Sequence, residues 1–373
     1  MPPVNVLIKP ASSACNMTCA YCFYRDVASH RQEGFQGMLS PRLMEEVVAG
    51  AMEFAEHSCS FLFQGGEPTL AGLDFYRQVV ELVKKHEKPG VKVSYAIQTN
   101  AFRLDEEWCA FFKEHDFLVG VSLDGPAELH NLNRTDPAQN GTFNDVMRSV
   151  ALLKKHGVTF NILCVLTGKN ARSIERIYRF FRKLGLDHIQ FIPCLEPLGQ
   201  ERGRERYHLS VEEYGEFLIR VFDLWFQDLL SGQYVSIRHI DNWLQILLGG
   251  QPEACGMVGR CSIQFVVEGD GGVYPCDFYV LDELRLGTVG ENSFAEMAQS
   301  AAARQFLQCS TPVPPECARC RWYVLCRNGC RRDRLTGADG LPGRSCYCDA
   351  LQRFFRERAG RLQQAAAILA RWR

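Results

Sequence analysis

Short apolar runs recur along the first half of the chain and alternate with segments of helical periodicity. Such runs are typical of parallel strands that are buried on both faces, and they fall at residues 4–8, 59–63, 91–98, 117–123, 158–167 and 188–195. Helical patterns lie between or after them, at residues 41–54, 75–86, 106–114, 143–156, 171–184 and 211–230. The first helix has Ser40 as a suitable N-cap and Pro41 at its first position.

This alternation of strand and helix predicts a parallel α/β barrel or open sheet. Six strand–helix repeats are fewer than the eight of a complete barrel, which favours a partial (β/α)6 barrel with its active site at the C-terminal strand ends. The pattern changes after about residue 235, where "FVVEGDGGVYPCDF" predicts a hairpin with its turn at residues 269–272. A helix is expected at the C-terminal end. We therefore predict two domains, residues 1–234 and residues 235–373.

Composition narrows the class of protein. The 373 residues carry 42 Lys and Arg against 43 Asp and Glu, a net charge of -1, which does not indicate a nucleic-acid or membrane partner. The start, "MPPVNVLIKP", lacks the apolar core of a signal peptide, and no run reaches transmembrane length. We expect a cytoplasmic protein. In a reducing compartment its 17 cysteines indicate metal or cluster ligation rather than disulfides.

Three of these cysteines follow the first predicted strand. Cys15, Cys19 and Cys22 have the spacing C-x3-C-x2-C. An iron–sulfur cube has four iron corners, so three thiolates leave one iron open, and an open position is what a catalytic metal site needs. A zinc ion with three thiolates and a water is the alternative.

With the aromatic Tyr21 before its last cysteine, this loop resembles the signature of the radical S-adenosylmethionine (SAM) enzymes, in which SAM chelates the open iron. The segment "FQGGEPTL" after the second strand resembles the GGE motif that holds the SAM amino group in that superfamily. The Arg134 guanidinium suits the SAM carboxylate. The resemblance implies that SAM is bound by Gln64, Gly65, Gly66, Glu67, Gln98, Ser122, Arg134 and Leu195.

Eight further cysteines near the C-terminal end are enough to form two closed sites of four cysteines each. A pair of structural zinc sites is one interpretation. Their pattern resembles the SPASM extension of peptide-modifying radical SAM enzymes, a cysteine-rich domain with two auxiliary 4Fe–4S clusters. The resemblance implies that one cluster is bound by Cys255, Cys261, Cys276 and Cys330, and the other by Cys317, Cys320, Cys326 and Cys348. Cys346 is an alternative to Cys348.

Taken together, the motifs resemble one family, the anaerobic sulfatase-maturating enzymes. They are "LIKPASSACNMTCAYCFY", "FQGGEPTLAGL", "LVGVSLDGP", "HNLNR", "QFVVEGDGGVYPCDFYVLD" and "CRNGCRR". This family oxidises a cysteine or serine of a sulfatase to Cα-formylglycine. The resemblance implies that a reduced cluster splits SAM and that the resulting radical takes a hydrogen atom from the β-carbon of the target. The target then loses a proton and an electron, and the auxiliary clusters accept the electron.

The resemblance also implies roles for two further residues and for partners. Asp277, beside Cys276, is the expected base, although its ordinary pKa of about 3.9 must be raised by burial; a turn-capping role is the alternative. Tyr24 is expected to position substrate or to donate a hydrogen bond, with packing as the alternative. The expected partners are an unfolded or nascent sulfatase with a C/S-x-P/A-x-R segment and an electron donor such as flavodoxin or ferredoxin.

Two other functions stay open on the sequence alone. SPASM-type radical SAM maturases use the same scaffold to make thioether or other crosslinks, or epimers, in ribosomal peptides. A zinc-stabilised binding protein is the hypothesis from a different class, and it would carry no iron.

Overall fold

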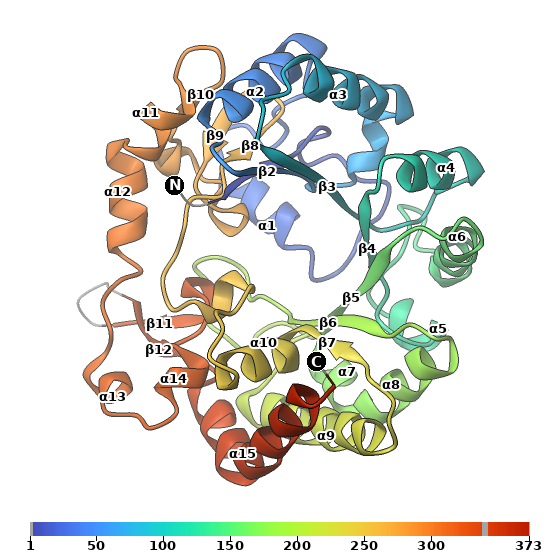
Figure 1. The fold of residues 1–373 in the computed structure, drawn as a ribbon, viewed down its shortest axis with the longest axis vertical. Coiled ribbons are helices and arrows are strands. Elements are labelled where there is room, and N and C mark those ends of the chain that lie inside the picture. Colours follow the sequence, from blue (N-terminus) through green and yellow to red (C-terminus); the bar gives the residue numbers. More distant parts are fainter. Residues whose placement is uncertain (1–2, 338–341, 373) are drawn as a thin grey trace. The chain divides into compact units, whose positions relative to one another are not determined.

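A computed structural model describes residues 3–337 and 342–372 (Figure 1). Two compact units are formed, and each combines separate segments of the chain. The first unit comprises Met1–Ser122, Asn131–Phe160 and Ser262–Phe306, and the second comprises Leu123–His130, Asn161–Cys261 and Leu307–Arg373. These units group residues by spatial contact, so the division of the chain between residues 234 and 235 stays a prediction.

The first unit is built on a sheet in the order β10-β9-β8-β1-β2-β3-β4. The strands from β8 to β4 run parallel, whereas β9 and β10 are antiparallel additions at the edge. Their bounds are β1 Val4–Ile8, β2 Ser58–Phe63, β3 Lys92–Thr99, β4 Leu118–Ser122, β8 Val266–Val267, β9 Gly272–Tyr274 and β10 Gly287–Thr288. The pairing of β8 with β1 joins residues some 260 positions apart in the chain.

Helices connect these strands, and the sequence explains where they begin. The Ser40 hydroxyl accepts the Leu43 N–H at 3.3 Å, with Pro41 at the first helical position, as predicted. The helices of this unit are α1 Phe23–Ser29, α2 Pro41–Phe54, α3 Leu73–Lys85, α4 Glu106–Glu114, α6 Phe143–Lys155, α11 Phe294–Ala298 and α12 Ala301–Gln308, which ends in the second unit. Short 3-10 turns lie at η1 Pro68–Ala71, η3 Asp277–Tyr279 and η4 Asp282–Leu284.

The second unit has the parallel strands β5, β6 and β7 and the hairpin β11–β12. Its strands are β5 Phe160–Leu166, β6 His188–Pro193, β7 Ser236–Ile237, β11 Arg334–Thr336 and β12 Pro342–Ser345. Its helices are α5 Ala127–His130, α7 Gly168–Arg172, α8 Ile174–Lys183, α9 Val211–Leu230, α10 Arg238–Leu247, α13 Pro315–Ala318, α14 Tyr323–Cys326 and α15 Cys348–Ala370, with 3-10 turns η2 Cys255–Met257 and η5 Arg331–Asp333.

The long helices α9 and α15 pack against each other in this unit, as Figure 1 shows. The Phe354 ring of α15 lies 4.9 Å from Trp243 and 5.5 Å from Phe222. At the rim, Arg358 donates through Nε and Nη2 to the two carboxylate oxygens of Asp223, both at 2.8 Å. The contact therefore combines a buried aromatic cluster with a bidentate ion pair.

All six predicted strands are present, within a few residues of the expected bounds, and the hairpin at residues 269–272 is confirmed. The helix predicted at residues 171–184 is wrong in one respect, because it is two helices that meet at Ser173. Thr167 caps the first of them by accepting the Asn170 N–H at 3.2 Å. In the described residues 3–337 and 342–372, no helix is long and apolar enough to cross a membrane.

Candidate functional site

The three-cysteine loop follows β1 in the first unit, at the C-terminal edge of its parallel strands. Cys15 Sγ accepts N–H groups from the Met17 backbone at 3.4 Å and from the Asn100 side chain at 3.7 Å. Cys22 is the N-cap residue of α1, and its N–H donates to Cys19 O at 3.3 Å. N–H donors on a cysteine sulfur are the outer-shell contacts that stabilise a cluster-bound thiolate.

The loop is tied to a second segment that carries Arg134. Thr18 N donates to Thr135 O at 2.8 Å, and Ala20 N donates to Asn133 O at 2.9 Å. Arg134 lies between these two contacts, is 6% exposed, and has its guanidinium carbon 5.4 Å from the centre of the Tyr21 ring. The fold thus holds this cation beside the cysteine loop.

The glycine turn after β2 is pressed against the same loop. Gly66 N donates to Ser12 O at 2.9 Å, and Glu67 N donates to Ala14 O at 2.8 Å. A Cβ atom at position 66 would lie 1.9 Å from Ala14 O, so only glycine fits this close backbone approach. Gly65 adopts a φ of 124°, which also favours glycine.

The Glu67 carboxylate is buried and already occupied. Its Oε1 accepts the Thr69 N–H at 3.0 Å and the hydroxyls of Thr69 and Thr99 at 2.6 and 2.8 Å, and its Oε2 accepts the Asn100 N–H at 2.8 Å. Burial raises the pKa of Glu67, and these hydrogen bonds oppose the rise. The side chain therefore fastens the ends of β2 and β3 to each other.

The other predicted SAM contacts lie in both units. Gln64 follows β2, and its Oε1 is 3.1 Å from the Tyr24 hydroxyl. Gln98 is half-buried within β3, and Ser122 is the buried last residue of β4. Leu195 follows β6 in the second unit.

Asp277 is the first residue of η3, just after β9, and it is 7% exposed. The Tyr24 hydroxyl donates to its Oδ2 at 2.9 Å, and Lys9 Nζ lies 3.3 Å from its Oδ1. Within the described structure, Oδ1 accepts no hydrogen bond although it is buried. Burial raises the pKa of Asp277, whereas the charge of Lys9 lowers it. A carboxylate whose pKa is raised by burial is a better general base near neutral pH than an exposed one.

Sequence reasoning missed three charged residues of this region, Lys9, Arg31 and Glu268, which are 3%, 8% and 1% exposed. Lys9 and Glu268 each follow an apolar strand directly. This position could have marked them in the sequence, because a charged side chain at the end of a buried strand needs a partner of opposite charge. Arg31 carries no such signal in its local sequence.

In the second unit, one cavity is lined by all four cysteines of a predicted auxiliary set, Cys317, Cys320, Cys326 and Cys348. Cys326 Sγ accepts the Asn328 N–H at 3.5 Å, and Cys348 Sγ accepts an N–H of the Gln352 amide at 3.3 Å. Cys346 is not among the lining residues of this cavity, and its own N–H donates to Asp333 O at 2.7 Å.

The other predicted auxiliary set is divided between the units, with Cys276 in the first and Cys255, Cys261 and Cys330 in the second. Cys330 Sγ accepts the Arg332 N–H at 3.4 Å. Across residues 3–337 and 342–372, no three His, Cys, Asp or Glu side chains converge on a point that could hold a single metal ion. A cubane cluster does not require such convergence, because each thiolate binds a separate iron.

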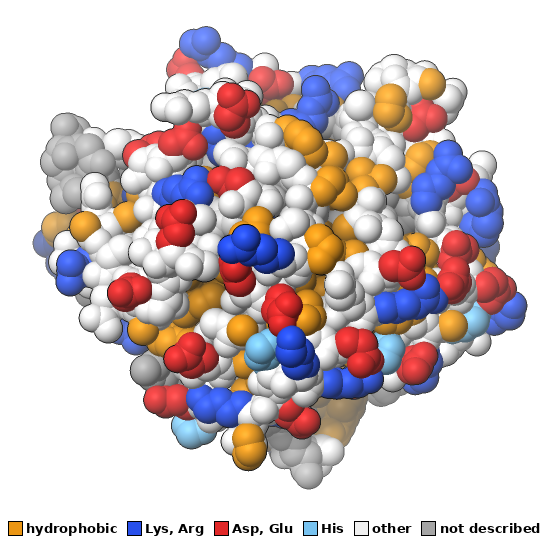
Figure 2. Space-filling model, turned by 90° about the horizontal axis from the view of Figure 1, so that it is seen from above, with side chains coloured by type: hydrophobic (Ala, Val, Ile, Leu, Met, Phe, Trp, Pro, Cys, Tyr) orange, Lys and Arg blue, Asp and Glu red, His pale blue; other side chains and the backbone are white. Residues whose placement is uncertain are grey.

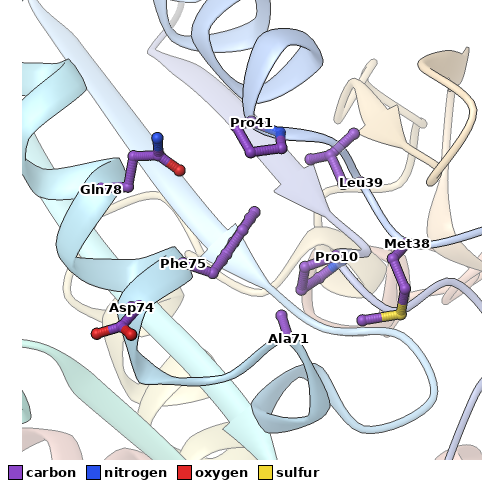
Figure 3. Close-up of a pocket in the computed structure, with 8 residues that line it drawn as sticks. All are labelled: Pro10, Met38, Leu39, Pro41, Ala71, Asp74, Phe75 and Gln78. Carbon is purple, nitrogen blue, oxygen red and sulfur yellow. The ribbon is translucent and has the colours of Figure 1, made fainter.

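An open apolar pocket of about 460 Å³ also lies in the first unit (Figure 3). It is lined by Pro10, Met38, Leu39, Pro41, Ala71, Asp74, Phe75 and Gln78, and none of these is a predicted site residue. On the molecular face of Figure 2, Lys and Arg side chains lie among Asp and Glu side chains, as the balanced composition led us to expect.

Comparisons with known proteins agree with the motifs. Residues 10–181 match the model of the radical SAM superfamily, and residues 255–321 match that of an iron–sulfur cluster-binding domain named SPASM. The chain is 44% identical to the cysteine-type anaerobic sulfatase-maturating enzyme of Clostridium novyi, over 99% of both chains. It is 32% identical to the serine-type enzyme of Bacteroides thetaiotaomicron, over 95% of this chain and 89% of that one. A solved structure, "Native anSMEcpe with bound AdoMet and Cp18Cys peptide", superposes with a TM-score of 0.94 at 43% identity, covering 99% of this chain and 100% of the other.

Proposed function

The chain belongs to the anaerobic sulfatase-maturating enzymes of the radical SAM superfamily, and we propose that it oxidises a cysteine of a sulfatase polypeptide to Cα-formylglycine. The observation that carries the choice of cysteine is the identity of 44% to a cysteine-type relative, against 32% to a serine-type one. The protein is thus a radical SAM oxidoreductase that performs a post-translational modification.

The cofactors are SAM and three 4Fe–4S clusters, in keeping with the radical SAM and SPASM domains. When bound, they supply a 5′-deoxyadenosyl radical that removes a hydrogen atom from the substrate β-carbon, and the auxiliary clusters take up the departing electron. Cys15, Cys19 and Cys22 would hold the SAM-binding cluster, and the N–H donors on Cys15 Sγ fit a ligating thiolate.

The SAM site would be made by the GGE turn together with Gln64, Gln98, Ser122, Arg134 and Leu195. Because the carboxylate of Glu67 is occupied by four hydrogen bonds, the turn would contribute through its backbone rather than through this side chain. Arg134, buried beside the cysteine loop, would pair with the SAM carboxylate.

The eight C-terminal ligands would hold the two auxiliary clusters in the sets expected from the sequence, Cys255, Cys261, Cys276 and Cys330, and Cys317, Cys320, Cys326 and Cys348. The shared cavity of the second set supports Cys348 as its fourth ligand, since Cys346 does not line that cavity.

Asp277 would act as the base. After the β-hydrogen has left, the substrate thiol gives its proton to Asp277 Oδ1, and one electron departs, which leaves a carbon–sulfur double bond. Hydrolysis of this thioaldehyde releases hydrogen sulfide and gives formylglycine. Tyr24 would hold the other carboxylate oxygen, Oδ2, through its 2.9 Å hydrogen bond, so that Oδ1 faces the proton.

The substrate would be an unfolded or nascent sulfatase segment of the form C-x-P/A-x-R, and the electron donor a flavodoxin or ferredoxin. A reducing cytoplasm suits both the free thiols and a substrate that has not yet folded. Because the chain belongs to this family, sulfatase maturation accounts for the cysteines better than the two other functions, a zinc-stabilised binding protein and a maturase of ribosomal peptides.

The test is an anaerobic reaction of the reconstituted protein with SAM, a reductant and matched peptides containing Cys-x-Pro-x-Arg or Ser-x-Pro-x-Arg. Mass spectrometry should find formylglycine at the cysteine, with an equal amount of 5′-deoxyadenosine and a lower yield from serine. The Asp277→Asn variant should lose formylglycine, and Cys22→Ala should lose SAM cleavage. SAM cleavage with both peptides unmodified would reject sulfatase maturation but leave the radical chemistry in place.

A further inference from the structure

Four buried charged side chains, one of them Asp277, lie together in the first unit beside Tyr24. Their position follows from the register of the sheet, because β1 and β8 pair in parallel with Ile8 opposite Val267. Lys9 and Glu268 are the next residues on the two chains, and Lys9 N donates to Val267 O at 2.9 Å. The two side chains therefore leave neighbouring strands at the same level of the sheet.

The ammonium group of Lys9 has three neighbours. Its Nζ lies 3.3 Å from Asp277 Oδ1, 3.5 Å from Glu268 Oε1 and 4.9 Å from the centre of the Tyr24 ring. The Lys9 side chain is only 4% exposed, so water cannot replace these contacts. A desolvated ammonium group over an aromatic face and between two carboxylates is held by cation–π attraction and by charge.

Arg31 completes the cluster at its far end. Its Nη1 lies 2.6 Å from Glu268 Oε1, and its Nη2 donates to Gly34 O at 2.6 Å. Two cations, Lys9 and Arg31, thus face two carboxylates, Glu268 and Asp277, and the formal charges cancel. A buried cluster of this kind tolerates poorly the loss of a single member, because one charge is then left without compensation.

We propose that Lys9 is a positioning residue for proton removal, which holds Oδ1 of the Asp277 carboxylate while Tyr24 holds Oδ2, and that Glu268 and Arg31 hold Lys9 in place. The proposal rests on the proposed role of Asp277 as base. Tyr24 anchors Oδ2 by a hydrogen bond of 2.9 Å, and Lys9 anchors Oδ1 through an ion pair of 3.3 Å. Oδ1 is thereby kept at a defined place while it remains able to receive the substrate proton.

The experiment separates hydrogen-atom removal from proton removal. A peptide with deuterium on the cysteine β-carbon reports the first event as deuterium in 5′-deoxyadenosine, and formylglycine reports the completed reaction. For Lys9→Met, we expect deuterium transfer within about threefold of the parent and formylglycine lower by about tenfold to a hundredfold, since small displacements of a reacting group cost this much. Lys9→Arg, which keeps the charge, should recover most of the product.

The matched control is Arg285→Met, which removes a cation that pairs with Asp270 on the same β8–β9 hairpin, at 3.0 Å, and is more exposed. It should leave the ratio of product to deuterium transfer unchanged. If Lys9→Met does not fold, Lys9→Met with Glu268→Gln removes one charge of each sign and should give the same changed ratio.

A parent-like ratio in Lys9→Met would overturn the positioning role, and so would an equal loss of deuterium transfer and product, which marks a purely structural residue. The Asp277→Asn variant distinguishes a failure of the positioning role of Lys9 from a failure of the role of Asp277 as base. If it lowers formylglycine while Lys9→Met does not, only the inference about Lys9 fails. If Asp277→Asn also keeps the parent ratio, the assignment of Asp277 as base fails with it.

Discussion

Replacement of Gly66 by alanine tests how closely the glycine turn controls the cysteine loop. The added Cβ atom would lie 1.9 Å from Ala14 O, whereas such contacts essentially never fall below 3.0 Å. The turn and the loop must therefore separate by about 1.1 Å, the difference between these two distances. Because the atom that the Cβ meets belongs to the backbone, no side-chain rotation can relieve the clash.

The energetic cost follows from the contacts between the two segments. A separation of this size breaks the 2.8 Å hydrogen bond from Glu67 N to Ala14 O and strains the 2.9 Å bond from Gly66 N to Ser12 O. Each such bond contributes about 1 kcal/mol, and overpacking adds about 1–3 kcal/mol. Since a misplacement of about 1 Å can lower a rate about a hundredfold, we expect Gly66→Ala to cleave SAM about a hundred times more slowly.

The assay measures iron content and the rate of 5′-deoxyadenosine formation in anaerobically reconstituted protein. Gly360→Ala is the matched control, because no atom lies within 4 Å of its added Cβ, and alanine should stabilise helix α15 by about 1 kcal/mol. A Gly66→Ala protein that cleaves SAM within about threefold of the parent rate would refute the argument that this turn fixes the cysteine loop.

Three further predictions concern the second unit. Cys348→Ala should lose about four irons per chain, the content of one cubane, whereas Cys346→Ala should keep the full content, as measured by iron and sulfide analysis. Burial lowers the pKa of His239 in the folded protein to about 4, from an ordinary value of 6.5. Between these two pH values the histidine binds a proton in the unfolded state but not in the folded state. About 3 kcal/mol of stability should therefore be present above pH 6.5 and be lost as the pH falls towards 4. About 2 kcal/mol of this loss falls between pH 8 and pH 5, and in His239→Leu it should vanish from anaerobic denaturation curves compared at these two pH values. Phe354→Ala should lower the free energy of unfolding by about 3–5 kcal/mol, whereas Trp372→Ala, at an exposed position, should change it by less than about 0.5 kcal/mol.

Local pattern was enough to predict the parallel strands and most helices, because a strand buried on both faces must be apolar along its length. It was not enough at residues 236–247, where β7 has two residues and is followed at once by α10. A strand that short has no periodicity of its own, and its place beside β6 depends on tertiary pairing. The break at Ser173 was missed for the opposite reason, since the helical pattern continues across it.

The residues of the candidate site likewise fall into those that local sequence predicted and those that depend on distant partners. Spacing within a short loop identified Cys15, Cys19 and Cys22, and the glycine turn was visible as a motif. The role of Glu67 in fastening β2 to β3 was not visible, because its partners Thr99 and Asn100 lie more than 30 residues away. A motif indicates which residues matter, but the number of free lone pairs on a side chain becomes known only when its partners are known.

The pairing of β1 with β8 explains why the charged cluster escaped sequence reasoning and also what it does for the fold. Lys9 and Glu268 meet only if Ile8 lies opposite Val267. A shift of one residue between these strands would turn every side chain to the other face of the sheet and leave buried charges without partners, at a cost of several kcal/mol each. The apolar strands alone would tolerate such a shift far better. The charges therefore specify the register, and that register in turn carries Cys276 and Asp277, which follow on β9, to the edge where the cysteine loop begins.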